Sequence, residues 1–114
     1  MLNLTPHPIV LMLDEGDLTI PPSGNVARVS VHDTPAGEVC IADLQNDEAF
    51  NVPVCRRVYG EPEGLPAEGV PCIVSALVAA AVPGRRGVFS PDTGAGAVRD
   101  AQGRIIGVRG LITA

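Results

Sequence analysis

The chain of 114 residues has no lysine, no tryptophan and only three aromatic residues, Phe50, Tyr59 and Phe89. Its formal net charge is −5, and all eight of its basic residues are arginine. Sequence-independent binding to DNA or RNA needs a basic surface that releases counterions, which an acidic chain does not offer. So few aromatic side chains also provide no stacking platform for bases. These absences argue against a nucleic-acid polymer as the partner.

Cysteine and histidine are also scarce. Cys40, Cys55 and Cys72 are far apart and include no Cys-x-x-Cys pair, so the spacing favours neither a disulfide framework nor a zinc site. We expect all three to be small hydrophobic residues buried in strands, in a reducing compartment. His7 and His32 are the only histidines, and a histidine base would need a nucleophile close in space. The serines are better explained as turn and cap residues, so we predict no catalytic residue, no metal site and no cofactor.

Long apolar runs are missing as well. No run approaches the ~20 residues that cross a membrane, and the N-terminus lacks the basic and apolar segments of a signal peptide. We therefore expect a cytoplasmic protein without membrane contact. The length suits a single domain over residues 1–114. The mean hydropathy is positive, which favours a homo-oligomer that covers apolar surface; a well-filled monomer core is the alternative.

The stretch 70–93 contains the one convincing helix. Cys72 begins a short apolar run typical of a buried strand, and Ser75 can cap the helix that follows. Residues 76–82 are all apolar and four are alanine, the best helix former. Pro83 and Gly84 end the pattern. The sequence predicts one short helix at about 75–82, apolar all round and therefore buried.

The rest of the chain reads as β structure, because thirteen glycines and eleven prolines mark frequent turns. A hairpin is expected over 9–20, a half-exposed strand over 26–31, and turns or loops over 32–37, 44–51 and 60–69. Further strands are expected over 37–43, 52–59 and 87–89, with a last hairpin over 97–112. About seven short strands and one helix favour a mainly β fold, a small compact β-barrel or sandwich with the helix at one end.

Arginines on the expected strands and polar residues in the loops suggest a ligand site. A guanidinium group held on a rigid strand can donate two parallel hydrogen bonds to the phosphate group of a ligand. The alternative is a solvated face with exposed ion pairs of little energetic value. We predict that a small anionic ligand contacts Thr5, His7, Arg28, Asp92, Thr93, Arg99 and Arg109.

A set of short motifs resembles a family of small uncharacterised proteins found in phage genomes and prophage regions. The resemblance spans nearly the whole chain and rests on the order and spacing of its motifs. The segment 36–51 lies outside it and is expected to be variable surface. The motifs are Asn3-Leu4-Thr5-Pro6-His7, Pro21-Pro22-Ser23-Gly24 with Ala27-Arg28, Gly64-Leu65-Pro66, Ile73-Val74-Ser75-Ala76-Leu77-Val78, Pro91-Asp92-Thr93-Gly94, Val98-Arg99-Asp100 with Gly103 and Ile105, and Gly107 with Arg109.

This resemblance implies a phage setting and no particular activity. Small non-enzymatic phage proteins include accessory factors that sequester a host nucleotide signal, and a small acidic β protein with scattered arginines fits that class. We therefore expect a non-enzymatic accessory protein that binds a nucleotide-like anion in the host cytoplasm. The alternative is a virion component, such as a capsid decoration or head–tail protein, that acts by contact with other proteins.

Overall fold

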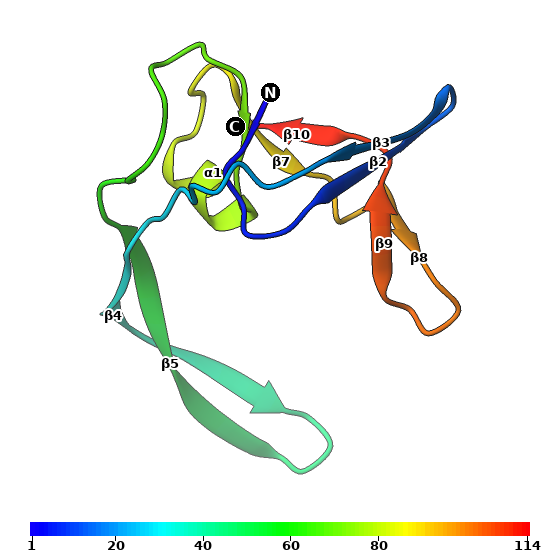
Figure 1. Cartoon of the computed structure of the whole chain (residues 1–114). Coiled ribbons are helices and arrows are strands. Elements are labelled where there is room, and N and C mark those ends of the chain that lie inside the picture. Colours follow the sequence, from blue (N-terminus) through cyan, green and yellow to red (C-terminus); the bar gives the residue numbers. More distant parts are fainter. The chain divides into compact units, whose positions relative to one another are not determined.

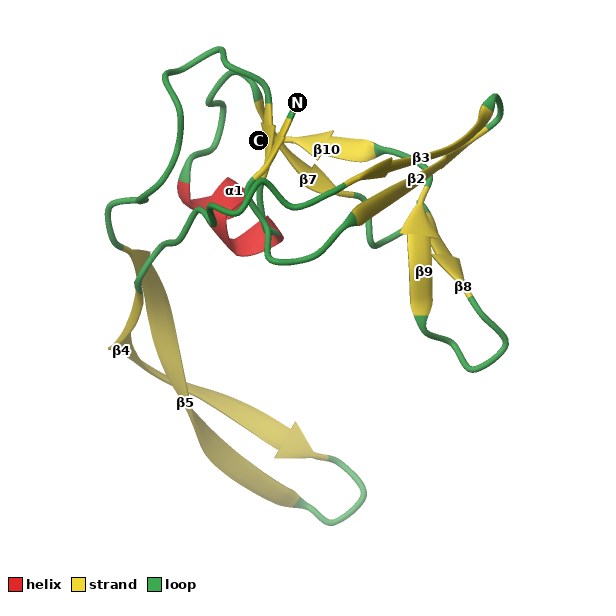
Figure 2. Cartoon of the chain, in the orientation of Figure 1, coloured by secondary structure: helices red, strands yellow, loops and turns green.

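The computed structural model describes residues 1–114 and is mainly β, as the sequence predicts (Figure 1; Figure 2). The chain divides into two compact units, a main unit of Met1–Val29 with Pro62–Ala114, and a hairpin unit of Ser30–Glu61. The single domain predicted over 1–114 stays a prediction, because this division does not show whether the hairpin unit folds alone. The elements are β1 (Leu2–Asn3), β2 (Ile9–Leu13), β3 (Gly16–Ile20), β4 (Val31–Asp43), β5 (Glu48–Tyr59), β6 (Cys72–Ile73), α1 (Ala76–Ala81), β7 (Val88–Pro91), β8 (Ala97–Arg99), β9 (Ile105–Val108) and β10 (Leu111–Thr113).

The main unit contains two four-stranded sheets, in the orders β1-β6-β7-β10 and β3-β2-β9-β8. In the first sheet β1, β6 and β7 are parallel, and β10 pairs with β7 in the antiparallel sense. In the second sheet β2 pairs antiparallel with β3 and parallel with β9, and β8 pairs antiparallel with β9. No sheet closes into a barrel, so the barrel of the sequence prediction is not formed.

The core of the main unit is aliphatic, because the chain has so few aromatic residues. Cys72, Ile73 and Val74 are 0% exposed, as expected for an apolar run in a central strand that is covered on both faces. Cys72 and Val74 belong to one cluster of buried residues, to which both parts of the main unit contribute. The cluster is made of Leu4, Ala27, Cys72, Val74, Val78, Ala79 and Val88.

Helix α1 begins as predicted and is less buried than predicted. The Ser75 side chain accepts a hydrogen bond from the Val78 backbone N–H at 3.3 Å, which caps the helix. Only Val78 and Ala79 are buried, whereas Leu77 is 42% exposed. The prediction of a helix buried all round is therefore wrong. A six-residue helix can place one side against β7, and alanines on the other side cost little in water.

The structure differs from the sequence prediction over residues 26–51, most of which lie in the hairpin unit. Residues 26–30 form no strand apart from an isolated bridge between Arg28 and Glu63. The predicted turn over 32–37 lies inside β4, and residues 48–51 of the predicted loop belong to β5. The cause is a β-bulge between Pro35 and Glu38, where Gly37 has a φ of +93°. Pro35 and Gly37, which are typical of turns, therefore lie within one long strand.

Two further predictions change in the C-terminal third. The last hairpin, predicted over 97–112, consists of β8 and β9 only, because the chain bends at Arg109 and Gly110 and continues as β10 in the other sheet. The strand predicted over 87–89 continues through Ser90 and Pro91 as β7. The hairpin over 9–20 and the loop over 60–69, which carries only the bridge at Glu63, are confirmed.

Candidate functional site

A cavity of about 270 Å³ in the main unit, which we call the Arg28 cavity, lies beside helix α1. Its walls come from three segments far apart in the sequence, and most of the lining side chains are apolar. Arg28 is the only charged residue that lines it. The lining residues are Leu4, Thr5, Pro6, Val26, Ala27, Arg28, Val29, Ser75, Leu77 and Val78.

Backbone hydrogen bonds hold Arg28 at this cavity. The Ala27 N–H donates to the Leu4 carbonyl at 3.0 Å, which ties the segment to the N-terminal strand. Arg28 and Glu63 exchange backbone hydrogen bonds of 2.9 and 2.8 Å. The Arg28 guanidinium itself makes no side-chain hydrogen bond and no ion pair. A fixed backbone with an unpaired guanidinium is suited to binding an anion from solution.

Thr5 also lines the cavity, and its hydroxyl belongs to a network centred on Asn3. The Asn3 side chain is 1% exposed, and its Oδ1 accepts from the Thr5 N–H at 3.0 Å and from Thr5 Oγ1 at 2.7 Å. Its Nδ2 donates to the carbonyls of His7 at 2.8 Å and Ile20 at 3.0 Å. All hydrogen-bonding capacity of the amide is therefore used. Thr5 and His7 thus shape the loop that forms one wall of the cavity.

Ser75, which the sequence predicts only as the cap of α1, also contributes its hydroxyl to the lining of the Arg28 cavity. Its Oγ accepts from the Val78 N–H, which leaves the hydroxyl proton free to donate. Ser75 lines the same cavity as Arg28. The sequence offers no signal for this second role, because the two residues are 47 positions apart and meet only in the folded chain.

Asp92 and Thr93 line a different cavity of about 420 Å³, which we call the Asp92 cavity. Asp92 Oδ1 accepts a hydrogen bond from the Gly94 N–H at 3.1 Å, as is usual for aspartate in a turn. No arginine lines this cavity, and a carboxylate repels an anion. The remaining lining residues are Ala76, Ala79, Ala80, Pro83, Ser90, Pro91, Gly94, Ile112, Thr113 and Ala114.

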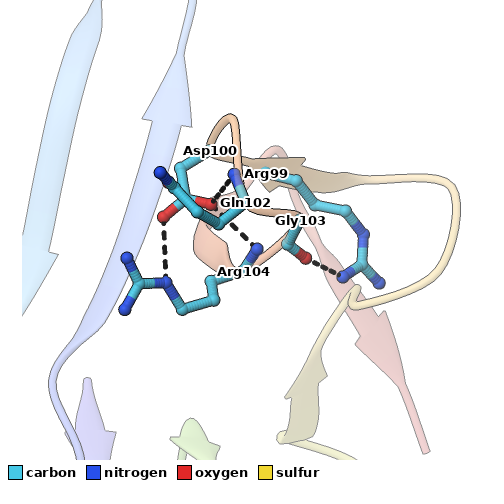
Figure 3. A network of polar contacts seen from close by, with 5 residues as sticks. All are labelled: Arg99, Asp100, Gln102, Gly103 and Arg104. Carbon is cyan, nitrogen blue, oxygen red and sulfur yellow. Dashed lines mark hydrogen bonds and ion pairs between the residues drawn. The ribbon is translucent and has the colours of Figure 1, made fainter.

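Arg99 and Arg109 line neither cavity. Figure 3 shows the Arg99 side chain folded back over the turn between β8 and β9, where Nη1 donates to the Gly103 carbonyl at 2.6 Å. Arg104 pairs with Asp100 at 3.3 Å in the same turn. The Arg109 side chain is exposed and has no partner. The structure thus brings Thr5 and Arg28 together, and Asp92 and Thr93 together. The other predicted ligand residues, His7, Arg99 and Arg109, join neither pair.

The remaining charged and polar groups show no reactive arrangement. In the hairpin unit, the hydrogen bond from Arg57 holds the pKa of the Asp33 carboxyl below its usual value. Burial raises the pKa of the Cys72 thiol. Cys40 and Cys55 are exposed, so the expectation that all three cysteines are buried is wrong for these two. No group of three or more His, Cys, Asp or Glu side chains is placed to hold a metal ion.

No known family model, curated protein or solved structure matches this chain. No helix is both long and apolar enough to cross a membrane. The chain is defined by its fold, a mainly β protein with a two-sheet main unit and a separate hairpin unit. Its functional assignment therefore depends on the residues of its own cavities and surfaces.

Proposed function

We propose that the protein binds a small anionic molecule in the Arg28 cavity and acts by binding, without catalysing a reaction. The observation that carries this proposal is the Arg28 guanidinium, which is unpaired and lines a cavity that is otherwise mostly apolar. Arg28 is exposed, as Arg109 is, but its place beside Leu4, Val29 and Leu77 lets one ligand contact both a cation and apolar side chains. The Ser75 hydroxyl supplies a neutral donor to the same ligand.

The chemistry of the walls favours a nucleotide-like ligand. A guanidinium can donate two parallel hydrogen bonds to a phosphate group. Leu4, Val29 and Leu77 can cover a flat ring. The volume of about 270 Å³ is just below the range of roughly 300–1,000 Å³ that is common for small-molecule sites. A mononucleotide, or part of a cyclic dinucleotide, is the size that we propose.

The biological part of the proposal depends on the resemblance to phage and prophage proteins. In that setting, a phage accessory protein in the host cytoplasm would bind and withhold a nucleotide signal of host defence. Sequestration requires no cofactor and no catalytic residue. It requires only that the protein bind the signal more tightly than the host receptor does.

One observation favours a second candidate function, a virion component that acts by protein contact. The hairpin unit exposes several large apolar side chains, including Ile41 and Phe50, which are each 51% exposed. Exposed apolar surface of this kind marks sites of protein–protein contact. Finding the protein in purified particles, with no nucleotide bound to the free protein, would favour this second function.

The anion proposal predicts that Arg28→Ala will weaken binding of a phosphate-bearing ligand by roughly 10-fold to 100-fold, the usual value of a charge-assisted hydrogen bond. Calorimetric titration of the protein with mononucleotides, cyclic dinucleotides and inorganic phosphate measures this change. Arg28→Lys keeps the charge and loses the two-pronged geometry, so it should bind with intermediate affinity.

Arg109→Ala is the matched control, because it removes the same charge from an unpaired, exposed arginine that lines neither cavity. We expect its affinity to equal that of the parent. If Arg109→Ala and Arg28→Ala lower the affinity equally, the ligand is held by general surface charge and the Arg28 assignment is wrong. Binding that neither substitution changes would contradict it as well.

A further inference from the structure

The hairpin unit has no buried residue, although β4 and β5 together contain 25 residues. A two-stranded hairpin alone in water is marginally stable at best, because it has no second layer to cover its apolar side chains. Figure 1 shows the two strands as a long twisted ribbon. The large apolar residues exposed by 36–51% in this unit are Val31, Val39, Ile41, Phe50, Val54, Val58 and Tyr59.

The strand register places most of these residues on one face. Residues that are paired across a sheet share a face, and successive residues of a strand alternate between faces. The pairs Val39 with Val52 and Ile41 with Phe50 therefore lie on the same face. Val54 and Val58 lie two and six residues after Val52 along β5, an even spacing that keeps them on that face, with Arg56 between them. We call this face, made of Val39, Ile41, Phe50, Val52, Val54 and Val58, the apolar stripe.

The opposite face of the hairpin carries only two of the large exposed apolar side chains, Val31 and Tyr59, among smaller residues such as Cys40 and Cys55. It carries the ion pair between Arg57 and Asp33, with 3.1 Å between Arg57 Nε and Asp33 Oδ1, and also Glu38 and Asn51. The stripe therefore gathers five of the seven large exposed apolar side chains on one face, which is the face that a second layer would cover. The area of the stripe is compatible with a weak specific interface. The six side chains, five of them 39–51% exposed, present on the order of 500 Å² per copy, so two facing copies bury on the order of 1,000 Å², the lower limit for a specific contact.

Charged residues on either side of Phe50, Val52 and Val54, the central part of the stripe on β5, indicate what covers it. On β5 this face reads Glu48, Phe50, Val52, Val54 and Arg56, an acid, three apolar residues and a base. Glu48 and Arg56 are eight residues apart in one strand, roughly 26 Å, so they cannot pair within one copy. Arg56 has no ion partner in the structure.

The order of these residues is complementary to itself when a second copy is turned by 180° about an axis that passes beside Val52, lies between the two faces and is perpendicular to β5. Glu48 of each copy then faces Arg56 of the other, Phe50 faces Val54, and Val52 lies on the two-fold axis. Asp43 pairs with Glu48 across the hairpin and adds to the acidic end, whereas His32 lies near the basic end. A two-fold contact needs one surface that complements itself, and the order of charged and apolar residues on β5 has that symmetry.

We propose that the apolar stripe binds the apolar stripe of a second copy of this chain in an antiparallel, face-to-face arrangement. The two hairpins then form a four-stranded sandwich whose sheets lie ~10 Å apart. The contact is separate from the Arg28 cavity, so it holds whether or not the protein binds an anion. It specifies the homo-oligomer that the sequence suggested and the surface that forms it.

Sedimentation velocity of the full chain over a range of concentrations tests this contact. We expect the parent to dimerise and Val52→Arg to weaken dimerisation by roughly 100-fold or more, because it buries two unpaired like charges at the axis. Asn51→Arg places the same side chain on the opposite face one residue away and should leave the dimer intact. Circular dichroism of both variants checks that the fold is retained.

A charge exchange distinguishes self-pairing from any other use of the stripe. Glu48→Arg and Arg56→Glu should each weaken the dimer by roughly tenfold, since each places like charges opposite one another. The double variant should restore the parent affinity. A monomeric parent, a dimer that survives Val52→Arg, or a double variant that is no tighter than either single one would overturn the proposal.

Discussion

Replacing Asn3 with alanine is expected to lower the free energy of unfolding by about 2–4 kcal/mol, since each buried polar group left without a partner costs about 1–3 kcal/mol. The substitution removes the partner of the Thr5 N–H and of the Ile20 carbonyl, whereas the Thr5 hydroxyl can still donate to the His7 carbonyl at 3.0 Å. Water can enter and satisfy some of them, which keeps the loss below the full sum. Urea denaturation of parent and variant at 25 °C measures the difference.

Asn3→Asp separates hydrogen bonding from shape. It keeps the size and the oxygen that accepts both bonds from Thr5, but it replaces the NH2 group and its two donors by one oxygen that faces the carbonyls of His7 and Ile20. We expect a loss at neutral pH at least as large as that of Asn3→Ala. Asn25→Ala, at an exposed asparagine, is the control and should change stability by no more than about 0.5 kcal/mol. A loss below 1 kcal/mol for Asn3→Ala would contradict the role of the network.

Gly87→Ala is expected to cost about 3 kcal/mol or more, which is large for the removal of a hydrogen atom. Gly87 has a φ of +84°, a conformation that an alanine adopts at a cost of roughly 1–2 kcal/mol. A Cβ there would lie 2.8 Å from the Val70 carbonyl oxygen and 3.0 Å from the Gly69 carbonyl carbon. Both atoms belong to the backbone, so relief requires β6 or β7 to move. Thermal denaturation should show a fall of roughly 10–20 °C.

Gly84→Ala isolates the effect of this close approach. Gly84 has a similar φ of +78°, but a Cβ at that position meets nothing within 4 Å. Its cost should therefore be the backbone conformation alone, roughly 1–2 kcal/mol. The close-approach explanation is wrong if the two alanine variants melt at the same temperature.

Local signals in the sequence predicted the elements whose causes are local. Ser75 caps α1 because its own hydroxyl reaches the Val78 N–H three residues ahead. The hairpin of β2 and β3 follows from an apolar run, the turn at Asp14 and Glu15, and the returning strand. The buried run at Cys72 also depends mainly on its own composition. These features need no knowledge of distant contacts.

The sequence misled where a distant partner decided the outcome. Pro35 and Gly37 have the composition of a turn, but pairing with β5 carries the strand through them by way of a bulge. The sequence overestimates the burial of α1, because a helix made only of apolar residues does not show which of its sides faces the core.

The candidate site could be predicted only in part, for the same reason. Arg28, Arg99 and Arg109 look alike in the sequence, yet Arg99 is bonded to Gly103 and only Arg28 lines a cavity with apolar walls. Which arginine is unpaired depends on contacts between segments that are far apart in the chain. The sequence also did not predict that Ser75 lines the same cavity as Arg28, or that buried Asn3 forms a hydrogen-bond network with Thr5, because both depend on distant contacts.

A native mass spectrum of the purified protein mixed with a panel of cyclic and linear nucleotides tests the proposal of an anion-binding protein most directly. We expect each chain to gain the mass of one nucleotide, and the Arg28→Ala variant to lose that gain under the same conditions. A parent protein that gains the mass of no phosphate-bearing compound at any concentration tested would contradict the proposal and leave protein contact as the function to pursue.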